Sequence, residues 1–337
     1  MVTDIHAHVI VPEVLRDAAP DETWRPLVRR EDGAQVVEVG GRAVRSMVEE
    51  VVDVDRIVAA EDEAGVERVV LSPFVPLLYY DVEPDEGLRR CRIQNQGLAR
   101  VVRERPGRVA ALGAVPLQGP ELAASELRAL VAEGGLCGVE VAASVRGVYL
   151  GDERFEPFWA AAEETRAVVF VHPTTRGFDA TVFGEYYLWN AVGNPLETTV
   201  TAAHMVLAGV LERHPGLCVV LAHGGGALLA LRGRLRHAHE QRTAAHDRLR
   251  ESPEDSIRRF HLDTVVHDLA LLRALVDYAG PERVLLGSDY PFDMGDLRPT
   301  ETVRACGLAP DLEAAILGGN AERLLSTAGA AREEVIR

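Results

Sequence analysis

Two histidines near the start of the chain have a spacing that indicates metal chemistry. His6 and His8 flank Ala7 directly after residues 2–5, the first strand that the sequence predicts. Side chains alternate along a strand, so residues two apart point the same way and both imidazoles can reach one ion. An isolated pair of this kind fits two surface histidines equally well. Its position after Asp4-Ile5, at the end of the predicted first strand, favours the metal site.

Two further residues of ligand type each close a run of strand length. His172 follows residues 167–171, and Asp289 follows residues 284–288. Taken singly, the histidine is also consistent with a core residue whose hydrogen bonds are satisfied, and the aspartate with a cap of the following turn. Together with the first pair they supply three imidazoles and one carboxylate, a set that suits Zn²⁺ with a water completing the shell. Mn²⁺ is the alternative ion.

His223 closes another apolar run, residues 217–222, and precedes a glycine triplet at 224–226. The glycines let the backbone turn tightly and leave the imidazole facing a cavity. A fifth ligand is one interpretation. A general acid or base is the favoured one, because imidazole titrates near neutrality. Among the other histidines, only His267 competes for this role.

These residues need a scaffold that brings strand ends together, and the chain provides one by alternating strands and helices. Apolar runs predict strands at 2–5, 68–71, 109–115, 136–141, 167–171, 217–222, 260–263 and 283–287, and helices fit 55–64, 85–105 and 121–133. An open, doubly wound sheet alternates in the same way. The count of eight favours a single (β/α)8 barrel domain over residues 1–337, with its site at the carboxyl ends of the strands.

Two segments are longer than ordinary barrel connections, at about residues 11–50 and 174–194. They are rich in aromatic side chains: Trp24, Phe178, Phe183, Tyr186, Tyr187 and Trp189. Such insertions usually cover a site or an interface. Trp189, together with Phe292 after the last strand, is predicted to contact the substrate.

Composition excludes several classes of function. The formal charge of −16 argues against nucleic acid or an anionic membrane as partner, and no apolar run approaches the roughly 18 residues of a spanning helix. All 36 basic residues are arginine, so Schiff-base chemistry and a carboxylated-lysine metal bridge are excluded. Four scattered cysteines and a start without signal-peptide features predict a cytoplasmic protein.

The motifs together resemble the amidohydrolase superfamily, more narrowly the branch with 2-amino-3-carboxymuconate-6-semialdehyde decarboxylase and aromatic-acid decarboxylases. The resemblance rests on Asp4-Ile5-His6-Ala7-His8, Val171-His172-Pro173, Ala222-His223-Gly224-Gly225-Gly226 and Gly287-Ser288-Asp289-Tyr290-Pro291-Phe292. It implies metal ligands at His6, His8, His172 and Asp289, catalytic roles for His223 and Asp289, and a barrel fold. The sequence Thr174-Thr175-Arg176-Gly177-Phe178 departs from the decarboxylase that gives the branch its name, so that substrate is not carried over.

The resemblance also implies arginines that bind the substrate carboxylate. Arg45 in Val44-Arg45-Ser46-Met47 takes this position, with Arg42 as the alternative register. Arg234, or Arg242, resembles an arginine that reaches the active site of a neighbouring subunit, which implies a homodimer. Solvated charge on a helix surface is the other interpretation of these helix arginines.

The sequence therefore predicts a non-oxidative decarboxylase acting on a small unsaturated or aromatic carboxylic acid. A metal-activated water and the His223 imidazole would supply the chemistry, and addition next to the carboxylate would be followed by loss of CO2. A hydrolase or hydratase acting on a C–N, C–O or C=C bond is the alternative, because the same ligand set serves both. A metal-holding barrel without turnover is a third possibility. It is disfavoured because His223 has no evident role as a metal ligand.

Overall fold

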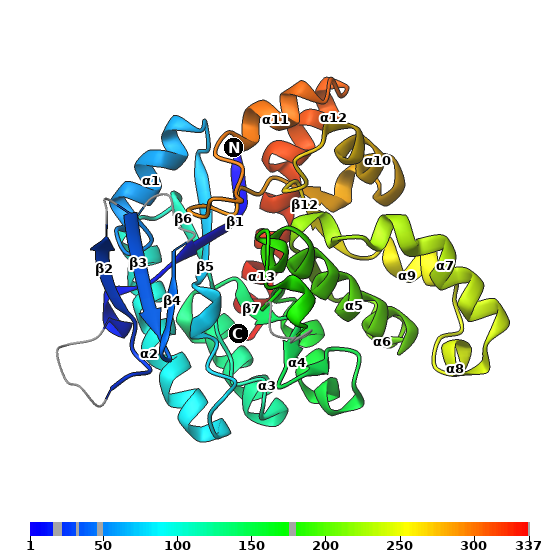
Figure 1. Cartoon of the computed structure of the whole chain (residues 1–337), viewed down its shortest axis with the longest axis horizontal. Helices are drawn as coiled ribbons and strands as arrows, with labels where there is room; N and C mark the ends of the chain where they lie inside the picture. Colours follow the sequence, from blue (N-terminus) through cyan, green and yellow to red (C-terminus); the bar gives the residue numbers. More distant parts are fainter. Residues whose placement is uncertain (16–21, 32–33, 46–49, 175–179, 336–337) are drawn as a thin grey trace.

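Eight strands form one parallel sheet in which neighbours in sequence are also neighbours in space (Figure 1). The computed structural model describes residues 1–15, 22–31, 34–45, 50–174 and 180–335. In sheet order the strands are β1 (Thr3–Val9), β5 (Arg68–Pro73), β6 (Val109–Gly113), β7 (Gly138–Ala142), β10 (Val168–His172), β11 (Cys218–Leu221), β12 (His261–Asp263) and β13 (Val284–Leu285). All eight predicted strands are confirmed.

The sheet closes because the segment after β13 pairs with β1. The Ile5 N–H donates to the Leu286 carbonyl at 2.9 Å, and the His8 N–H donates to the Tyr290 carbonyl at 2.8 Å. These bonds join the first and last strands. The predicted (β/α)8 barrel is therefore confirmed, and the open doubly wound sheet is wrong.

Helices lie between the strands and cover the outside of the barrel (Figure 1). The three helices expected from the sequence occur as α1, α2 and α3, each beginning one residue before its predicted start. The helices are α1 (Val54–Glu63), α2 (Pro84–Glu104), α3 (Pro120–Ala129), α4 (Glu156–Thr165), α5 (Asn194–Leu207), α6 (Val210–Arg213), α7 (Leu228–Gln241), α8 (Thr243–His246), α9 (Pro253–Ile257), α10 (Leu269–Ala279), α11 (Pro299–Ala305), α12 (Pro310–Ala314) and α13 (Asn320–Val335). Within the described ranges, none is both long and apolar enough to cross a bilayer.

Two strand boundaries differ from the sequence prediction in ways that matter for the site. β1 continues to Val9, so His6 and His8 lie inside the strand rather than after it, and the pairing of Val9 with Pro73 carries the strand that far. β13 ends at Leu285, four residues before Asp289. The two histidines are tolerated inside β1 because each has a polar partner from another strand: His6 Nδ1 lies 2.7 Å from Asp263 Oδ2, and His8 Nδ1 lies 3.1 Å from the Pro73 carbonyl.

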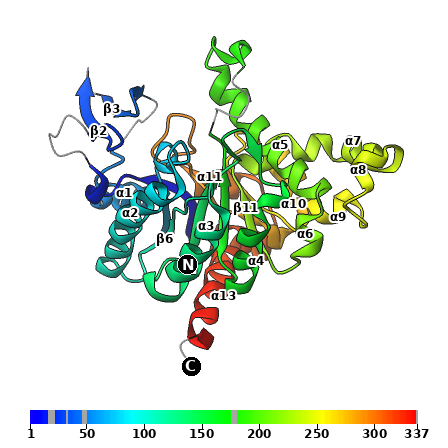
Figure 2. The same ribbon diagram turned by 90° about the horizontal axis from the view of Figure 1, so that it is seen from below.

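Below the site the barrel interior is apolar. Its buried side chains form one cluster with residues of α13. The cluster includes Ile5, Val70, Leu112, Phe170 and Val220 from the strands and Leu324 and Leu325 from the helix. Figure 2 shows α13 in red, crossing the end of the barrel opposite the three-stranded sheet described below. Burial of these side chains excludes water from that end, so the open face is the other one.

The described parts of both long segments lie over the open face. Three strands of the first segment form an antiparallel sheet: β2 (Leu27–Glu31), β3 (Ala34–Val39) and β4 (Arg42–Val44). After β10, the chain makes the short turns η5 (Thr181–Phe183) and η6 (Trp189–Gly193) before α5. Figure 2 shows the small sheet and the green segment before α5 at the same end of the molecule.

Candidate active site

Five residues singled out in the sequence meet at the carboxyl ends of the strands. Ligand atoms of His6, His172, His223 and Asp289 all lie within 4.8 Å of one another. His8 joins them, because its Nε2 lies 3.2 Å from His6 Nε2 and 3.2 Å from Asp289 Oδ1. All but His223, which is 12% exposed, are buried. The residues come from β1, β10, the loop after β11 and the segment after β13.

The three histidines of β1 and β10 share one orientation, in which Nδ1 is hydrogen-bonded and Nε2 faces the cluster. Their Nδ1 contacts are His6 to Asp263 Oδ2 at 2.7 Å, His8 to the Pro73 carbonyl at 3.1 Å and His172 to the Pro173 carbonyl at 2.9 Å. Carbonyl oxygens only accept hydrogen bonds, so Nδ1 of His8 and of His172 must carry the proton. Their Nε2 lone pairs are therefore free to bind an ion.

The cluster has the polarity that a divalent cation requires. His172 Nε2 is buried without a hydrogen-bond partner in the described part of the chain, and Asp289 Oδ1 lies 3.1 Å from His6 Nε2 and 3.2 Å from His8 Nε2. Burial alone would lower the pKa of His6, but the carboxylates of Asp289 and Asp263 outweigh it and raise that pKa to about 10. Facing nitrogen lone pairs beside a buried carboxylate fit an ion such as Zn²⁺ or Mn²⁺.

His223 stands at the edge of the same cluster on a glycine loop. Its Nε2 lies 3.4 Å from Asp289 Oδ2, and its backbone N–H donates to Asp263 Oδ2 at 3.0 Å. The loop needs glycine, because Gly226 has a φ of +64° and a Cβ there would lie 1.9 Å from the Pro195 carbonyl oxygen. His223 thus lies at the edge of the cluster, a position open to an acid or base as well as to a ligand. It was expected to face a cavity, but it is not among the residues that line the cavity described next.

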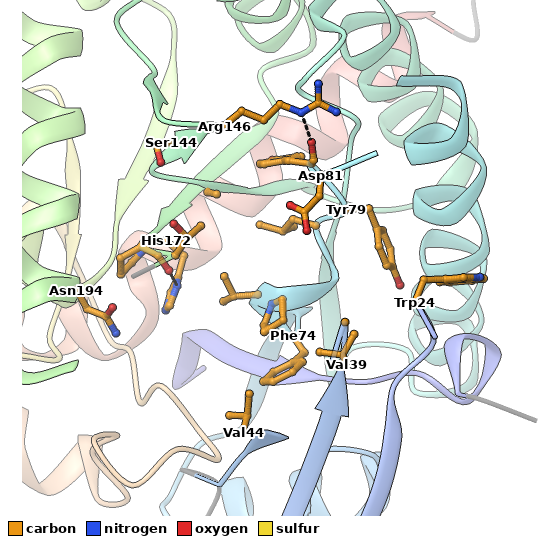
Figure 3. Close-up of a pocket in the computed structure, with 18 of the residues that line it drawn as sticks. Trp24, Val39, Val44, Phe74, Tyr79, Asp81, Ser144, Arg146, His172 and Asn194 are labelled. Atoms are coloured by element: carbon orange, nitrogen blue, oxygen red, sulfur yellow. Dashed lines mark hydrogen bonds between the residues drawn. The ribbon is translucent and has the colours of Figure 1, made fainter. Parts of the chain in front are cut away.

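A cavity of about 540 Å³ opens beside the cluster (Figure 3). His172 and Asp289 form part of its wall, and both insertions supply lining residues, among them Trp24 and Trp189. Phe292 also lines it and packs nearly parallel to Phe74, with ring centroids 6.0 Å apart. Described residues of both insertions therefore border the cavity. The volume suits a small organic ligand, and the walls suit a planar one.

Comparison with known proteins identifies the family. The family model described as amidohydrolase matches residues 3–327. The chain belongs to the amidohydrolase family. It is 30% identical to 2-amino-3-carboxymuconate-6-semialdehyde decarboxylase of Dictyostelium discoideum over 327 residues, which cover 96% of this chain and 90% of that protein.

Solved structures of decarboxylases share the fold of this amidohydrolase. The crystal structure of 5-carboxyvanillate decarboxylase from Sphingomonas paucimobilis superimposes with a TM-score of 0.76 at 29% identity, covering 82% of this chain and 84% of that one. Dihydroxybenzoic acid decarboxylase from a Polaromonas species, solved with manganese and 2-nitroresorcinol, has a TM-score of 0.78 at 23% identity, covering 97% of both chains.

Sequence reasoning about this amidohydrolase missed Asp263, the residue that connects the cluster. It ends β12 and is fully buried. Besides His6 Nδ1 and the His223 N–H, its carboxylate accepts the Gly224 N–H at 2.8 Å. It therefore fixes a predicted ligand and the loop of the predicted acid or base with one side chain. An aspartate at the end of a predicted strand was the available signal.

The arginines predicted to bind the substrate carboxylate lie outside the cavity wall of the described chain. Arg45 is 59% exposed and pairs with Glu31 at 3.3 Å, and Arg234 and Arg242 are exposed on α7 and at its end. The Arg42 side chain, Ser46, Met47 and residues 175–178 fall outside the described residues. Arg90 and Arg146, which the sequence did not single out, do line the cavity.

Proposed function

We propose that this amidohydrolase is a metal-dependent decarboxylase that removes CO2 from a small aromatic or unsaturated carboxylic acid. The observation that carries the proposal is a buried His/Asp cluster opening into a cavity walled by aromatic rings. The named relatives act on acids of this kind. Hydrolysis is not favoured, because each of those relatives is a decarboxylase.

The chain's own residues have three tasks in this reaction. Phe74, Phe292 and Trp189 hold a planar substrate against the cavity wall. When bound, a divalent ion supplies positive charge that orients the substrate and activates water. Loss of CO2 leaves an electron pair on the substrate carbon, and a proton must replace the lost group. His223 is placed at the edge of the cluster to hold and transfer this proton.

The test of this function is release of CO2. Metal-loaded protein would be incubated with hydroxylated, aminated and open-chain unsaturated carboxylic acids while CO2 and the decarboxylated product are followed. We expect at least one acid to lose one CO2 per product formed. Hydrolysis or hydration products without CO2, or turnover of no acid by fully loaded protein, would contradict the proposal.

We further propose one ion per chain, bound by His6, His8, His172 and Asp289, with Zn²⁺ expected and Mn²⁺ the alternative. Elemental analysis should find about one equivalent, and His6→Ala combined with His8→Ala should lose it. Because the pKa of His6 is about 10 without an ion, binding at pH 8 should release about one proton. Two tightly bound ions, or full loading of the double variant, would show that the ligand set is wrong.

We also propose that the protein acts as a cytoplasmic homodimer, with Arg234 or Arg242 of one chain beside the active site of the other. Figure 1 shows α7 extending from the side of the barrel opposite β4, the strand just before Arg45. One chain therefore does not bring Arg45 and Arg234 together. Two arginines from two chains would offset the acidic charge of the protein around a carboxylate substrate.

A further inference from the structure

Glu197 is a buried carboxylate of α5 that holds two residues of the cavity wall. It is fully buried, whereas Ser144 and Thr174 line the cavity. Its Oε2 accepts the Thr174 N–H at 2.6 Å, and its Oε1 accepts the hydroxyls of Thr174 at 2.8 Å and Ser144 at 3.1 Å. In all three bonds the carboxyl group is the acceptor, as its ionised form requires. A buried charge is costly, and these bonds offset that cost.

The shortest of these bonds connects Glu197 to His172 through a single peptide group. The Thr174 N–H and the Pro173 carbonyl belong to the same planar unit and point in opposite directions. That carbonyl accepts the proton of His172 Nδ1 at 2.9 Å. One edge of the peptide group therefore holds the imidazole, and the carboxylate holds the other edge. Because the group is rigid, fixing the direction of its N–H also fixes the direction of its carbonyl.

The equivalent peptide group behind His8 lacks a carboxylate. Its carbonyl, from Pro73, lies 3.1 Å from His8 Nδ1. Its N–H, from Phe74, donates to the neutral Val9 carbonyl at 3.1 Å. A bond to an ionised acceptor is stronger, and it polarises the peptide group so that the carbonyl oxygen becomes more negative. The Pro173 carbonyl is therefore the better acceptor of the two, in agreement with its shorter distance to the imidazole.

We infer that Glu197 is a positioning residue for the proposed metal ligand His172 and acts through the Pro173–Thr174 peptide group. The carboxylate orients this group and makes its carbonyl a stronger acceptor. The proton of His172 is thereby kept on Nδ1, and Nε2 is left free for the ion. This inference rests on the metal site of the proposed function. It does not require that the reaction be a decarboxylation.

Metal affinity tests this inference without requiring turnover. Competition with a chromogenic chelator would give the Zn²⁺ affinity of the wild type, Glu197→Gln and Glu197→Ala. Loss of a group that orients a ligand lowers metal affinity by about 10- to 100-fold, so we expect a loss of about 10-fold for alanine. Glutamine can accept the Thr174 N–H without a charge, and we expect a loss of about 2- to 5-fold. Because glutamine keeps the side-chain volume, this variant decides the question if Glu197→Ala does not fold.

The tautomer of His172 is a second measurement, which neither a general loss of stability nor a simple charge effect on the ion would change. Nitrogen NMR of metal-free protein with labelled histidines distinguishes a ring protonated on Nδ1 from one protonated on Nε2. The His172 signals are assigned by their absence from His172→Asn. We expect the wild type to carry the proton on Nδ1. In Glu197→Ala a measurable share should carry it on Nε2, because the Pro173 carbonyl is no longer held, and the share in Glu197→Gln should be smaller.

Glu163→Ala is the matched control. Glu163 also accepts a backbone N–H, that of Gly216 at 2.8 Å, and its other oxygen lies 2.9 Å from His214 Nδ1. Neither bond reaches the metal-type cluster, so this variant should lose stability but keep the Zn²⁺ affinity and the His172 tautomer of the wild type.

Two results would overturn the inference. One is unchanged Zn²⁺ affinity in the Glu197 variants that fold. The other is weaker affinity with an unchanged tautomer, since the carboxylate would then act on the ion through its charge alone. A wild type that binds no ion would contradict the proposed metal site and this inference with it. Absence of CO2 release by metal-loaded protein would instead refute only the decarboxylase.

Discussion

Replacing His223 with asparagine is expected to reduce turnover by about 10²–10⁴-fold while the bound metal stays near one equivalent. Asparagine is a more informative substitution than alanine. His223 has a φ of +57°, and asparagine adopts this backbone conformation more readily. The Asp263 contact to the His223 N–H at 3.0 Å is a backbone contact and survives the change. The variant thus removes the imidazole and keeps the loop.

The measurements are kcat, metal content and the pH–rate profile on the same preparations. Loss of metal together with activity would make His223 a ligand, which its distance of 3.4 Å from Asp289 also permits. If the imidazole transfers the proton, the limb of the pH profile that reports its titration should disappear in His223→Asn. An unchanged profile would assign the proton to another group.

His267→Asn provides a control with the same backbone geometry. His267 has a φ of +54° and is exposed, and its Nε2 lies 2.8 Å from the Met294 carbonyl. Unlike His223, it is not one of the cluster residues. We expect this variant to keep its activity and its pH profile. The opposite pattern, with His267→Asn inactive and His223→Asn active, would assign the proton transfer to His267.

Arg45→Ala and Arg234→Ala are each expected to be nearly inactive, and their mixture is expected to regain about a quarter of wild-type activity. In a randomly mixed pair, half of the dimers contain one chain of each kind, and each such dimer has one site with both arginines. The structure supports the premise, because both side chains are exposed and the elements beside them, β4 and α7, lie on opposite sides of the barrel in Figure 1. Loss of the Arg45–Glu31 surface pair should change stability little.

Two further proteins make this result interpretable. Arg236→Ala, on the same helix but paired with Glu254 at 3.0 Å, should stay active and show that α7 tolerates loss of charge. Mixing Arg45→Ala with the Arg45→Ala/Arg234→Ala double variant should restore nothing, because no site then holds both arginines. A single-variant mixture that stays inactive despite demonstrated subunit exchange, or a monomeric protein, would contradict the shared site.

The barrel and its ligand-type cluster could be predicted from the sequence because both depend on local patterns. Each strand is a short apolar run, and a parallel barrel gathers all its strand ends on one face. Residues as distant as His6 and Asp289 were therefore expected to meet without knowledge of packing. The ends of β1 and β13 were less well predicted, because the length of a strand depends on its pairing with a neighbouring strand rather than on the length of its apolar run.

The cavity wall was decided by tertiary structure. Tyr79, Arg90 and Arg146 come from a loop, a helix and a hairpin, and no periodicity or spacing marks them as neighbours. Likewise, the sequence places Asp263 at the end of a predicted strand, but only the fold shows that its carboxylate contacts both His6 and the His223 loop. Strand ends are local and repeat at every strand, whereas a wall built from loops depends on how distant segments pack. For that reason the sequence determined which chemistry this chain carries, and the tertiary structure determined the space in which a substrate meets it.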